Sequence, residues 1–479
     1  MARLVLVSNR VADPHKPAAG GLAVALGDAL SQSGGLWFGW SGQIDERGVA
    51  GEATVREQRI GPVTYATMDL SRVDHDEYYL GYSNQALWPA FHYRLDLAAF
   101  EQSNFAGYQR VNRMFARQLA AMLQPDDVIW VHDYHLIPLA AELRALGCQQ
   151  RIGFFLHIPL PPSPILAALP GHEWLIRSLF AYDLVGLQSV GDVEHFARYV
   201  IAEGHAEMLP DGHYRAFGRI VCARAFPIGL DVEEFQREAR SREALETYKM
   251  LGEQYAKRRL LVGVDRLDYS KGLPQRLRAF RELLATYPEA RMSATLIQVA
   301  SPTREAVMAY EDIRKQLEGL SGEINGEYGE LDWMPVRYIH RTWSRRRLAA
   351  LYRKACVALV TPLRDGMNLV AKEYIAVQDP RDPGVLVLSR FAGAAEQLRE
   401  ALLVNPYDIQ ATAQAFQRAL QMPLGERVER HAALLATIRR HDVHAWRRGF
   451  LQALAMAQRD DHQHQHDQEP APAPQTQVA

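Results

Sequence analysis

Short, nearly continuous apolar runs alternate with longer amphipathic segments along most of the chain. In the N-terminal half these runs are Leu4–Val7, Leu36–Trp40, Asp127–Val131, Ile152–Leu156 and Leu184–Leu187. Apolar strands separated by helices are typical of a parallel sheet that is covered on both faces. The pattern therefore predicts a doubly wound α/β fold.

The same alternation begins again after residue 229. Its apolar runs are Leu260–Val264, Ala294–Val299, Val336–Ile339, Val357–Val360 and Val385–Leu388. We therefore expect two Rossmann-like domains, residues 1–229 and 230–440, facing a cleft. A helical segment over 441–458 follows, and the polar tail 459–479 has a composition typical of disorder.

Composition and charge exclude several classes of protein. The chain has 479 residues, with 54 Lys and Arg against 56 Asp and Glu, a net charge of −2. This balance argues against general binding to nucleic acid or anionic membranes. The 3 cysteines lack the spacing of metal ligands and are expected to be buried thiols in a reducing compartment. No run approaches the roughly 20 apolar residues of a membrane span, so we expect a soluble cytoplasmic protein.

Polar residues follow several of the predicted strands. Asp133 and His157 come after two strands of the first half, and Arg266 and Asp365 after two of the second. Ligands bind to doubly wound sheets outside the carboxyl ends of the strands. We therefore expect these side chains at a site between the domains, where Asp133 accepts from sugar hydroxyls or acts as a base and His157 donates to a hydroxyl or a developing charge.

Residues 364–373 join a strand to a helix. The backbone N–H groups at such a helix start form a binding site for phosphate, and Asn368 suits the N-cap. Glu373, one turn later, suits ribose hydroxyls. The segment is interpreted as a site for a nucleotide-linked sugar, and an ordinary strand-to-helix turn is the alternative.

A second basic turn runs from Arg266 to Gly272. Arg266 and Lys271 suit the oxygens of a departing diphosphate, and Gly272 can adopt a conformation that other residues avoid. The alternative is a surface salt bridge with Asp268.

Two further motifs are weaker. Arg10 ends the first strand, and Gly20-Gly21 permit close approach of a ligand, although such a pair usually marks only a turn. Asp74-His75-Asp76 has the D-x-D pattern of metal-dependent sugar transferases. It lies in a charged stretch with no strand predicted before it, so we expect it at the surface. No metal site is predicted.

Eight blocks of sequence closely resemble the retaining trehalose-6-phosphate synthases, a GT-B glycosyltransferase family. They are Leu4–Arg10, Gly20–Leu22, Leu36–Gly42, Asn84–Leu97, Trp130–Leu136, Arg151–Pro159, Arg266–Leu273 and Thr361–Glu373. The resemblance extends from about residue 1 to about residue 455. It implies transfer of glucose from UDP-glucose to glucose 6-phosphate, a C-terminal helix that crosses back to the first domain, no cofactor or metal, and a homo-oligomer, either a dimer or a tetramer.

The resemblance also implies roles for individual residues. Those of the acceptor pocket are Arg10, Tyr79, Asp133 and Arg304. Those of the donor site are Gly20, Gly21, Arg266, Lys271, Trp343, Asp365, Leu369, Val370, Ala371, Lys372 and Glu373. Trp88 and Ile158 match positions that shape anomeric selectivity, and His157 matches one near the transferred sugar. Where the family often has a Phe against the uracil of the nucleotide, this sequence has Trp343. The nucleotide preference is therefore open, and ADP-glucose and GDP-glucose are alternative donors.

The mechanism implied by the resemblance is front-face substitution. No carboxylate can be placed on the far face of the sugar for a double displacement. Arg266, Lys271, Asp365 and His157 are the candidate catalytic residues, and the leaving phosphate takes the acceptor proton. The alternatives are a related transferase with an acceptor such as glycerol phosphate, and an inactive sugar-phosphate-sensing subunit.

Overall fold

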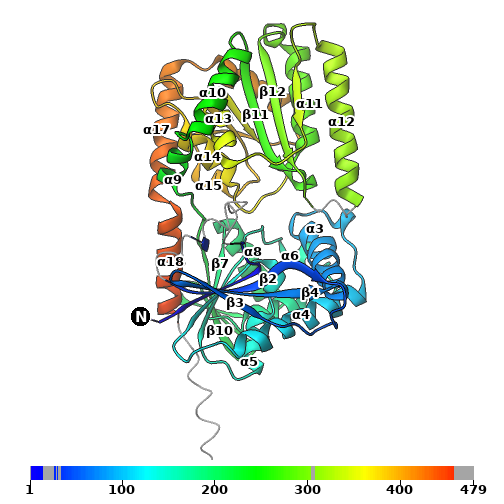
Figure 1. Cartoon of the computed structure of the whole chain (residues 1–479), viewed down its shortest axis with the longest axis vertical. Helices are drawn as coiled ribbons and strands as arrows, with labels where there is room; N and C mark the ends of the chain where they lie inside the picture. Colours follow the sequence, from blue (N-terminus) through cyan, green and yellow to red (C-terminus); the bar gives the residue numbers. More distant parts are fainter. Residues whose placement is uncertain (1, 14–25, 28–29, 31–33, 304–307, 458–479) are drawn as a thin grey trace, which may run out of the picture.

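The computed structural model describes residues 2–13, 26–27, 30, 34–303 and 308–457. The chain forms two lobes that lie one above the other along the long axis of the molecule, each with a sheet between helices (Figure 1). This is the two-domain α/β fold that the repeated apolar pattern predicts.

The sheet of the first lobe has ten strands in the order β3-β4-β2-β1-β5-β6-β7-β10-β9-β8. The strands are β1 (Leu4–Arg10), β2 (Gly35–Asp45), β3 (Arg56–Ile60), β4 (Val63–Ser71), β5 (Val128–His132), β6 (Arg151–Phe155), β7 (Leu184–Leu187), β8 (Glu207–Leu209), β9 (His213–Ala216) and β10 (Arg219–Ala225). Neighbouring strands from β4 to β10 pair in parallel, whereas β3, β9 and β8 pair antiparallel at the two edges. The five predicted strands are all present at the parallel centre.

Helices cover both faces of this sheet. They include the π-helix η1 (His75–Leu87), α3 (Trp88–Phe91), α4 (Gln102–Ala120), α5 (Leu139–Ala145), α7 (His172–Leu179) and α8 (Val190–Ala202). In α4 the buried residues Tyr108, Val111, Phe115 and Leu119 recur every three or four positions, so one face of the helix enters the core.

The sheet of the second lobe is entirely parallel, with six strands in the order β13-β12-β11-β14-β15-β16. They are β11 (Arg259–Arg266), β12 (Ala294–Ser301), β13 (Val336–Ile339), β14 (Val357–Val360), β15 (Val385–Ser389) and β16 (Leu402–Val404). The helices around it are α9 (Val232–Glu238), α10 (Arg242–Gln254), α11 (Leu273–Thr286), α12 (Met308–Tyr328), α13 (Arg345–Lys354), α14 (Leu369–Val377), α15 (Ala394–Gln397) and α16 (Ile409–Gln421). All five predicted strands are confirmed.

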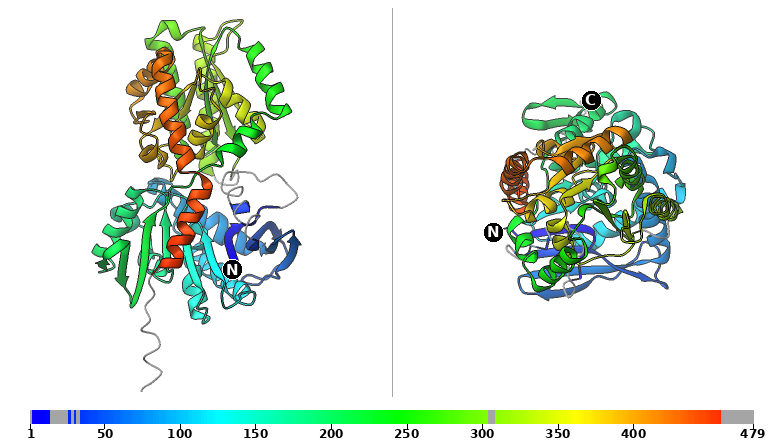
Figure 2. Two further views of the ribbon diagram at one scale, coloured as in Figure 1. Left: turned by 90° about the vertical axis from the view of Figure 1, so that its left-hand side faces the viewer. Right: turned by 90° about the horizontal axis from the view of Figure 1, so that it is seen from above.

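The last two helices connect the lobes. Helix α17 (Leu424–Arg440) packs on the second lobe, and α18 (Val443–Met456) returns to the first (Figure 2). Phe450 of α18 stacks on Trp130 with ring centroids 4.5 Å apart. A Cβ at Gly153 or Gly186 would lie 2.8 or 2.7 Å from the Phe450 ring, so the glycines allow the helix to approach the sheet. The predicted crossing helix is confirmed.

Two local predictions were wrong in part. The Asp74-His75-Asp76 motif does follow a strand, β4, and Asp74 is fully buried, whereas Asp76 is exposed as expected. Its carboxylate accepts from Ser71 and Arg110 and from the backbone of Gly51, so it closes a structural network. Of the three cysteines, which are all free, only Cys222 is fully buried.

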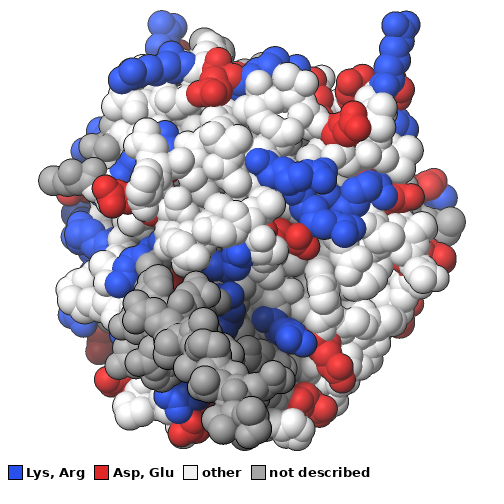
Figure 3. Space-filling view, turned by 90° about the horizontal axis from the view of Figure 1, so that it is seen from below, with Lys and Arg blue, Asp and Glu red and all other residues white. Residues whose placement is uncertain are grey.

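One face of the molecule carries both kinds of charge. On the underside, uncharged residues predominate, acidic and basic side chains both occur, and several basic side chains lie together in one patch (Figure 3). Within the described ranges, every helix is too short or too polar to cross a bilayer.

Candidate active site

The carboxyl end of β1 carries Arg10 beside a group of aromatic rings. Arg10 pairs in register with Trp40 of β2, and its guanidinium packs over Gly42, where a Cβ would lie 2.5 Å from Nε. The Trp40 ring is 5.3 Å from that of Tyr79, which in turn stacks on His135. Trp40 is thus the register partner of Arg10 and a ring neighbour of Tyr79, which places both residues next to this tryptophan along the chain fold.

Asp133 has a backbone conformation that is rare for any residue except glycine. It follows β5 with φ 76° and ψ 165°. Its Oδ1 accepts from the backbone N–H of His157 at 3.1 Å, and its own N–H donates to Phe155. Conformations of this kind cost about 1–3 kcal/mol and are concentrated at functional sites. The predicted proximity of Asp133 and His157 is therefore present, and it is held by the ends of adjacent strands.

The imidazole of His157 contacts protein at both nitrogens. Nε2 lies 3.1 Å from Nδ1 of His132, and Nδ1 lies 3.4 Å from Nε2 of Gln188. Oε1 of Gln188 accepts from the Ile228 backbone, so its amide nitrogen faces His157. Burial lowers the pKa of His157 to about 3. The ring is therefore neutral near pH 7 and has a single N–H. Because Nδ1 accepts from Gln188, that N–H is on Nε2 and faces His132, so the ring must give up the His132 contact before it can donate to a sugar.

In the second lobe a buried ion pair lies where the strands end. Nζ of Lys271 is 2.6 Å from Oδ2 of Asp365, which also accepts from Asn368 at 3.0 Å. Burial raises the pKa of Asp365, but the charge and hydrogen bond of Lys271, together with His92 and Asn368, outweigh it, so the net pKa lies below the ordinary value. Asp365 is thus ionised and holds the ammonium in place.

The alternative pairing with Asp268 is not formed. Asp268 accepts instead from the backbone of Ser270 and the hydroxyl of Tyr310. Gly272 adopts the expected left-handed conformation with φ 64°, and a Cβ there would lie 2.3 Å from the Thr361 carbonyl oxygen. This close turn directs Lys271 towards Asp365.

Arg266, the last residue of β11, reaches the first lobe. Its guanidinium carbon lies 5.3 Å from the ring centre of Trp88, and the ring of His92 is 4.2 Å from that of Trp88. Burial lowers the pKa of His92 to about 4, so that ring is neutral. A cation over an indole face is attracted by the π electrons, and Trp88 therefore contacts the predicted diphosphate-binding cation across the lobe interface.

Helix α14 begins as predicted. Asn368, with φ 86°, accepts from the N–H of Ala371 at 3.3 Å and caps the helix. The first amides of a helix have no acceptor within it, so Leu369 and Val370 present donors at this end. Burial raises the pKa of Glu373 to about 7, although the Arg345 cation opposes the shift.

One predicted donor residue is placed differently from the rest, and the role of another is not decided by its contacts. The side chain of Lys372 is fully buried and bonds to Ile228 and Gln397 rather than extending towards a ligand. Trp343, half-buried before α13, has the guanidinium carbons of Arg341 and Arg347 at 5.9 and 5.1 Å from its ring centre. Its role at the base stays a prediction.

The two lobes meet directly at these strand ends. A Cβ at Gly366 would lie 2.3 Å from the carbonyl oxygen of His157 and 3.1 Å from the carbonyl carbon of Ile158. The Arg364 guanidinium lies 4.4 Å from the ring centre of Tyr93. His157, Ile158 and Trp88 of one lobe therefore lie against Gly366 and Arg266 of the other, with Asp133 next to His157 and Asp365 next to Gly366, at the interface that the sequence predicts.

Other predicted residues lie outside the described part of the chain. They are Gly20, Gly21 and Arg304, together with the tail. The sequence analysis also missed four residues that the structure places at the site: Trp40, His92, Gln188 and Arg364. All but Gln188 lie in blocks that carry the family resemblance, which was the available signal.

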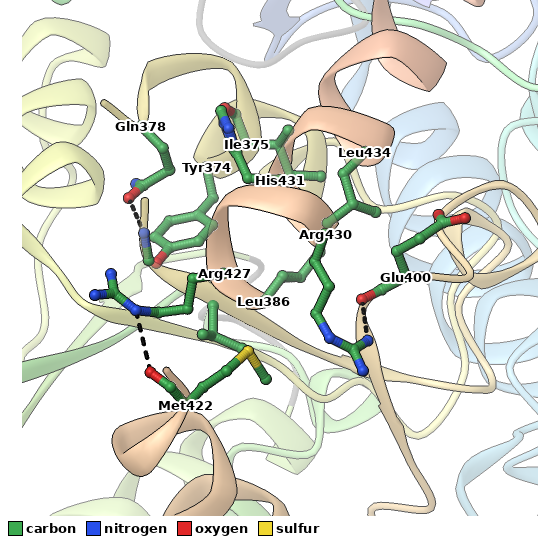
Figure 4. A pocket seen from close by; sticks show the side chains of 12 residues that line it. Tyr374, Ile375, Gln378, Leu386, Glu400, Met422, Arg427, Arg430, His431 and Leu434 are labelled. Carbon is green, nitrogen blue, oxygen red and sulfur yellow. Dashed lines mark hydrogen bonds between the residues drawn. The ribbon is translucent and has the colours of Figure 1, made fainter. Parts of the chain in front are cut away.

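A small cavity lies on the back of α14. Tyr374, Ile375 and Gln378 line it on one side and Arg427, Arg430 and His431 of α17 on the other (Figure 4). Its volume is about 10 Å³, which is room for roughly one water molecule. A sugar nucleotide therefore cannot bind there. In the described ranges no group of three or more His, Cys, Asp or Glu side chains is arranged to hold a metal ion.

Comparison with known proteins defines the class of this chain. Residues 7–456 match the model of glycosyltransferase family 20. A trehalose-6-phosphate synthase of Sinorhizobium fredii is 51% identical over 458 residues, which is 95% of this chain and 98% of that protein. One from Klebsiella pneumoniae is 47% identical over 95% of both chains.

Solved structures agree. The α,α-trehalose-phosphate synthase (UDP-forming) of Burkholderia xenovorans in complex with glucose 6-phosphate superposes with a TM-score of 0.91 at 51% identity, covering 95% of this chain and all of that one. An E. coli structure with bound UDP-2-fluoro glucose has a TM-score of 0.91 at 45% identity over 96% of this chain and all of its own. The chain belongs to glycosyltransferase family 20 and is a glycosyltransferase with two Rossmann-like lobes.

Proposed function

We propose that this chain is an α,α-trehalose-6-phosphate synthase, which transfers glucose from UDP-glucose to the anomeric hydroxyl of glucose 6-phosphate with retention. The observation that carries the proposal is the convergence at the lobe interface. The Lys271–Asp365 pair and the capped start of α14 face the ends of β5 and β6, where Asp133 and His157 lie. The activities and ligands of relatives at 45–51% identity support it.

The first lobe is assigned the acceptor. Arg10, the register partner of Trp40, and Tyr79, whose ring is next to that of Trp40, provide a cation and a hydroxyl for the phosphate of glucose 6-phosphate. Asp133 takes sugar hydroxyls, because a carboxylate is an acceptor for several of them. We propose, from the resemblance alone, that Arg304 also binds this phosphate.

The second lobe is assigned the donor. Arg266, Lys271 and the first amides of α14 neutralise the diphosphate as the bond to the glucosyl carbon breaks. Asp365 anchors Lys271 and takes glucosyl hydroxyls, and Glu373 takes those of the ribose. Gly20 and Gly21 let the backbone approach the donor, Trp343 faces the base, and Trp88 and Ile158 shape the space between the two sugars.

The transfer takes place on one face of the sugar. The bond from the anomeric carbon to the phosphate oxygen breaks first, and positive charge develops on the ring. The acceptor's anomeric oxygen then bonds to that carbon from the same side, and its proton passes to the leaving phosphate. The enzyme accelerates this reaction by aligning the two sugars and by stabilising the charge on the leaving diphosphate. The proposed reaction uses no metal ion and no cofactor. We also propose that the protein forms a homo-oligomer.

One assay tests the proposal. The protein is incubated with glucose 6-phosphate and UDP-, ADP- or GDP-glucose in turn, and release of nucleoside diphosphate is followed along with the disaccharide phosphate. UDP release that depends on glucose 6-phosphate is expected, with and without a chelator. Preferred use of glycerol 3-phosphate would replace the acceptor assignment, and no release with any pair would favour the sensing subunit.

A further inference from the structure

Lys372 lies among predicted donor residues, but its side chain extends into the protein. It is fully buried, and Nζ donates to the carbonyl oxygen of Ile228 at 2.7 Å and to Oε1 of Gln397 at 2.8 Å. No carboxylate of the described residues forms an ion pair with it. Burial lowers the pKa of Lys372 to about 7. A buried ammonium held only by neutral oxygens is costly, so its retention beside the start of α14 needs an explanation.

The acceptor of this lysine belongs to the segment that joins the lobes. Ile228 lies between β10 of the first lobe and α9 of the second. Its carbonyl is held by Lys372, and its N–H donates to Gln188 at 3.0 Å. The Gln188 side chain then contacts His157 at 3.4 Å. A continuous series of contacts therefore runs from α14 through the linker to the strand end that carries His157.

The second connection between the lobes lies against the same point. A Cβ at Gly229 would lie 2.2 Å from the backbone of Asp442 and 2.3 Å from the carbonyl oxygen of His441. His444 and Asp231 are linked at 3.2 Å. Burial and then the Lys372 cation lower the pKa of His441. The two linkers thus cross backbone against backbone, with the lysine ammonium close to both.

We propose that Lys372 is a positioning residue that ties the donor-binding helix α14 to the hinge between the lobes and does not touch the nucleotide with its side chain. Because α14 and the hinge are held together, the seating of the diphosphate at the helix start sets the position of Ile228 and, through Gln188, of His157. The inference rests on the proposed function, because it takes α14 as the donor site.

The test compares Lys372→Met with Lys249→Met, an exposed lysine of α10 whose side chain is 80% accessible. For each protein we measure kcat with saturating UDP-glucose and glucose 6-phosphate, the Kd of UDP by calorimetry, and the radius of gyration by small-angle scattering with and without UDP plus glucose 6-phosphate. Methionine keeps an unbranched, apolar side chain that is one atom shorter, and it removes the donor.

The expected result for Lys372→Met is a kcat lower by roughly tenfold or more, since small misplacements at a reacting centre have large effects. The Kd of UDP should stay within about twofold of wild type, because no contact with the nucleotide is lost. The contraction on adding both ligands should be reduced. Lys249→Met should match wild type in all three measurements.

Gln397→Met provides a second variant that leaves the ammonium in place. It should change kcat and contraction in the same direction by less, because the contact with Ile228 stays, and it should add nothing to Lys372→Met in the double variant, because Gln397 acts only by holding the Lys372 ammonium. If Lys372→Met does not fold, the proposal is tested with Gln397→Met alone. A wild-type kcat and a wild-type contraction of Gln397→Met would then overturn the proposal.

Two further outcomes would overturn it. A UDP Kd weakened tenfold or more with kcat intact at saturation would show that Lys372 contacts the nucleotide. A lower melting temperature with unchanged kcat and contraction would show a purely structural lysine. The proposed function fails separately: wild-type protein that releases no UDP would refute it, while UDP binding and contraction would still report on Lys372.

Discussion

The two strand ends that meet at the lobe interface are built from different chemistry. In the first lobe the polar groups at the ends of β5 and β6 are held by hydrogen bonds, a strained aspartate and neutral imidazoles. In the second lobe the corresponding positions carry a buried Lys271–Asp365 pair and the capped start of a helix. The difference shows a division of labour, in which one lobe orients hydroxyls and the other stabilises charge.

The largest expected effect tests the charged side of this comparison. Lys271→Ala should lower kcat by roughly 10²–10³, because one donor aimed at developing charge in a dry site is worth about 3–4 kcal/mol. Removing it also leaves Asp365 as an unpaired buried carboxylate. Steady-state kinetics with both substrates check this, with Lys354→Ala in the same lobe as the control. Intact turnover in Lys271→Ala would contradict the charge assignment.

A smaller effect is expected on the acceptor side. Arg10→Ala should raise the KM for glucose 6-phosphate by roughly 10- to 100-fold with a smaller change in kcat, since a charged hydrogen bond is worth about 1.5–3 kcal/mol. Arg59→Ala, an exposed arginine on β3, is the matched control. Unchanged saturation by glucose 6-phosphate would remove Arg10 from the acceptor pocket.

The pH dependence of donor binding sharpens the comparison further. Glu373 has a pKa raised to about 7 by burial, so it is increasingly protonated below that value and accepts poorly from ribose hydroxyls. The apparent Kd of UDP-glucose should therefore rise several-fold between about pH 7.5 and 6, up to about tenfold per unit below the pKa. Binding measured by calorimetry should lose this slope in Glu373→Gln. An identical slope in that variant would assign the titration to another group.

The smallest expected effect concerns the contact between the two sides. Trp88→Leu removes the ring over which Arg266 lies at 5.3 Å. A cation–π contact is worth about 0.5–2 kcal/mol, so kcat/KM for UDP-glucose should fall by roughly 2- to 30-fold. Trp174→Leu, on α7 and in edge-to-face contact with Phe105, serves as the control. Equal losses in the two variants would show that only packing was lost.

Local sequence patterns predicted the framework of both lobes. Apolar runs locate the strands because a strand buried on both faces needs no polar alternation. The N-cap at Asn368 and the left-handed Gly272 could also be predicted, since each depends on one residue and its immediate neighbours. Where polar residues follow strands, the parallel fold brings them to one edge. Such rules cannot detect the π-helix η1. Tyr79 lies in this helix, and only the family resemblance predicted it as a site residue.

Only the tertiary structure decided which partners these residues take. Lys271 pairs with Asp365, 94 positions away, and not with nearby Asp268. Lys372 turns inward to a linker carbonyl 144 positions away, while Asp74 is buried against Arg110. A sequence motif specifies side-chain chemistry and local backbone shape. Charge pairing and burial, in contrast, depend on distances between segments that become neighbours only when both lobes have folded and docked.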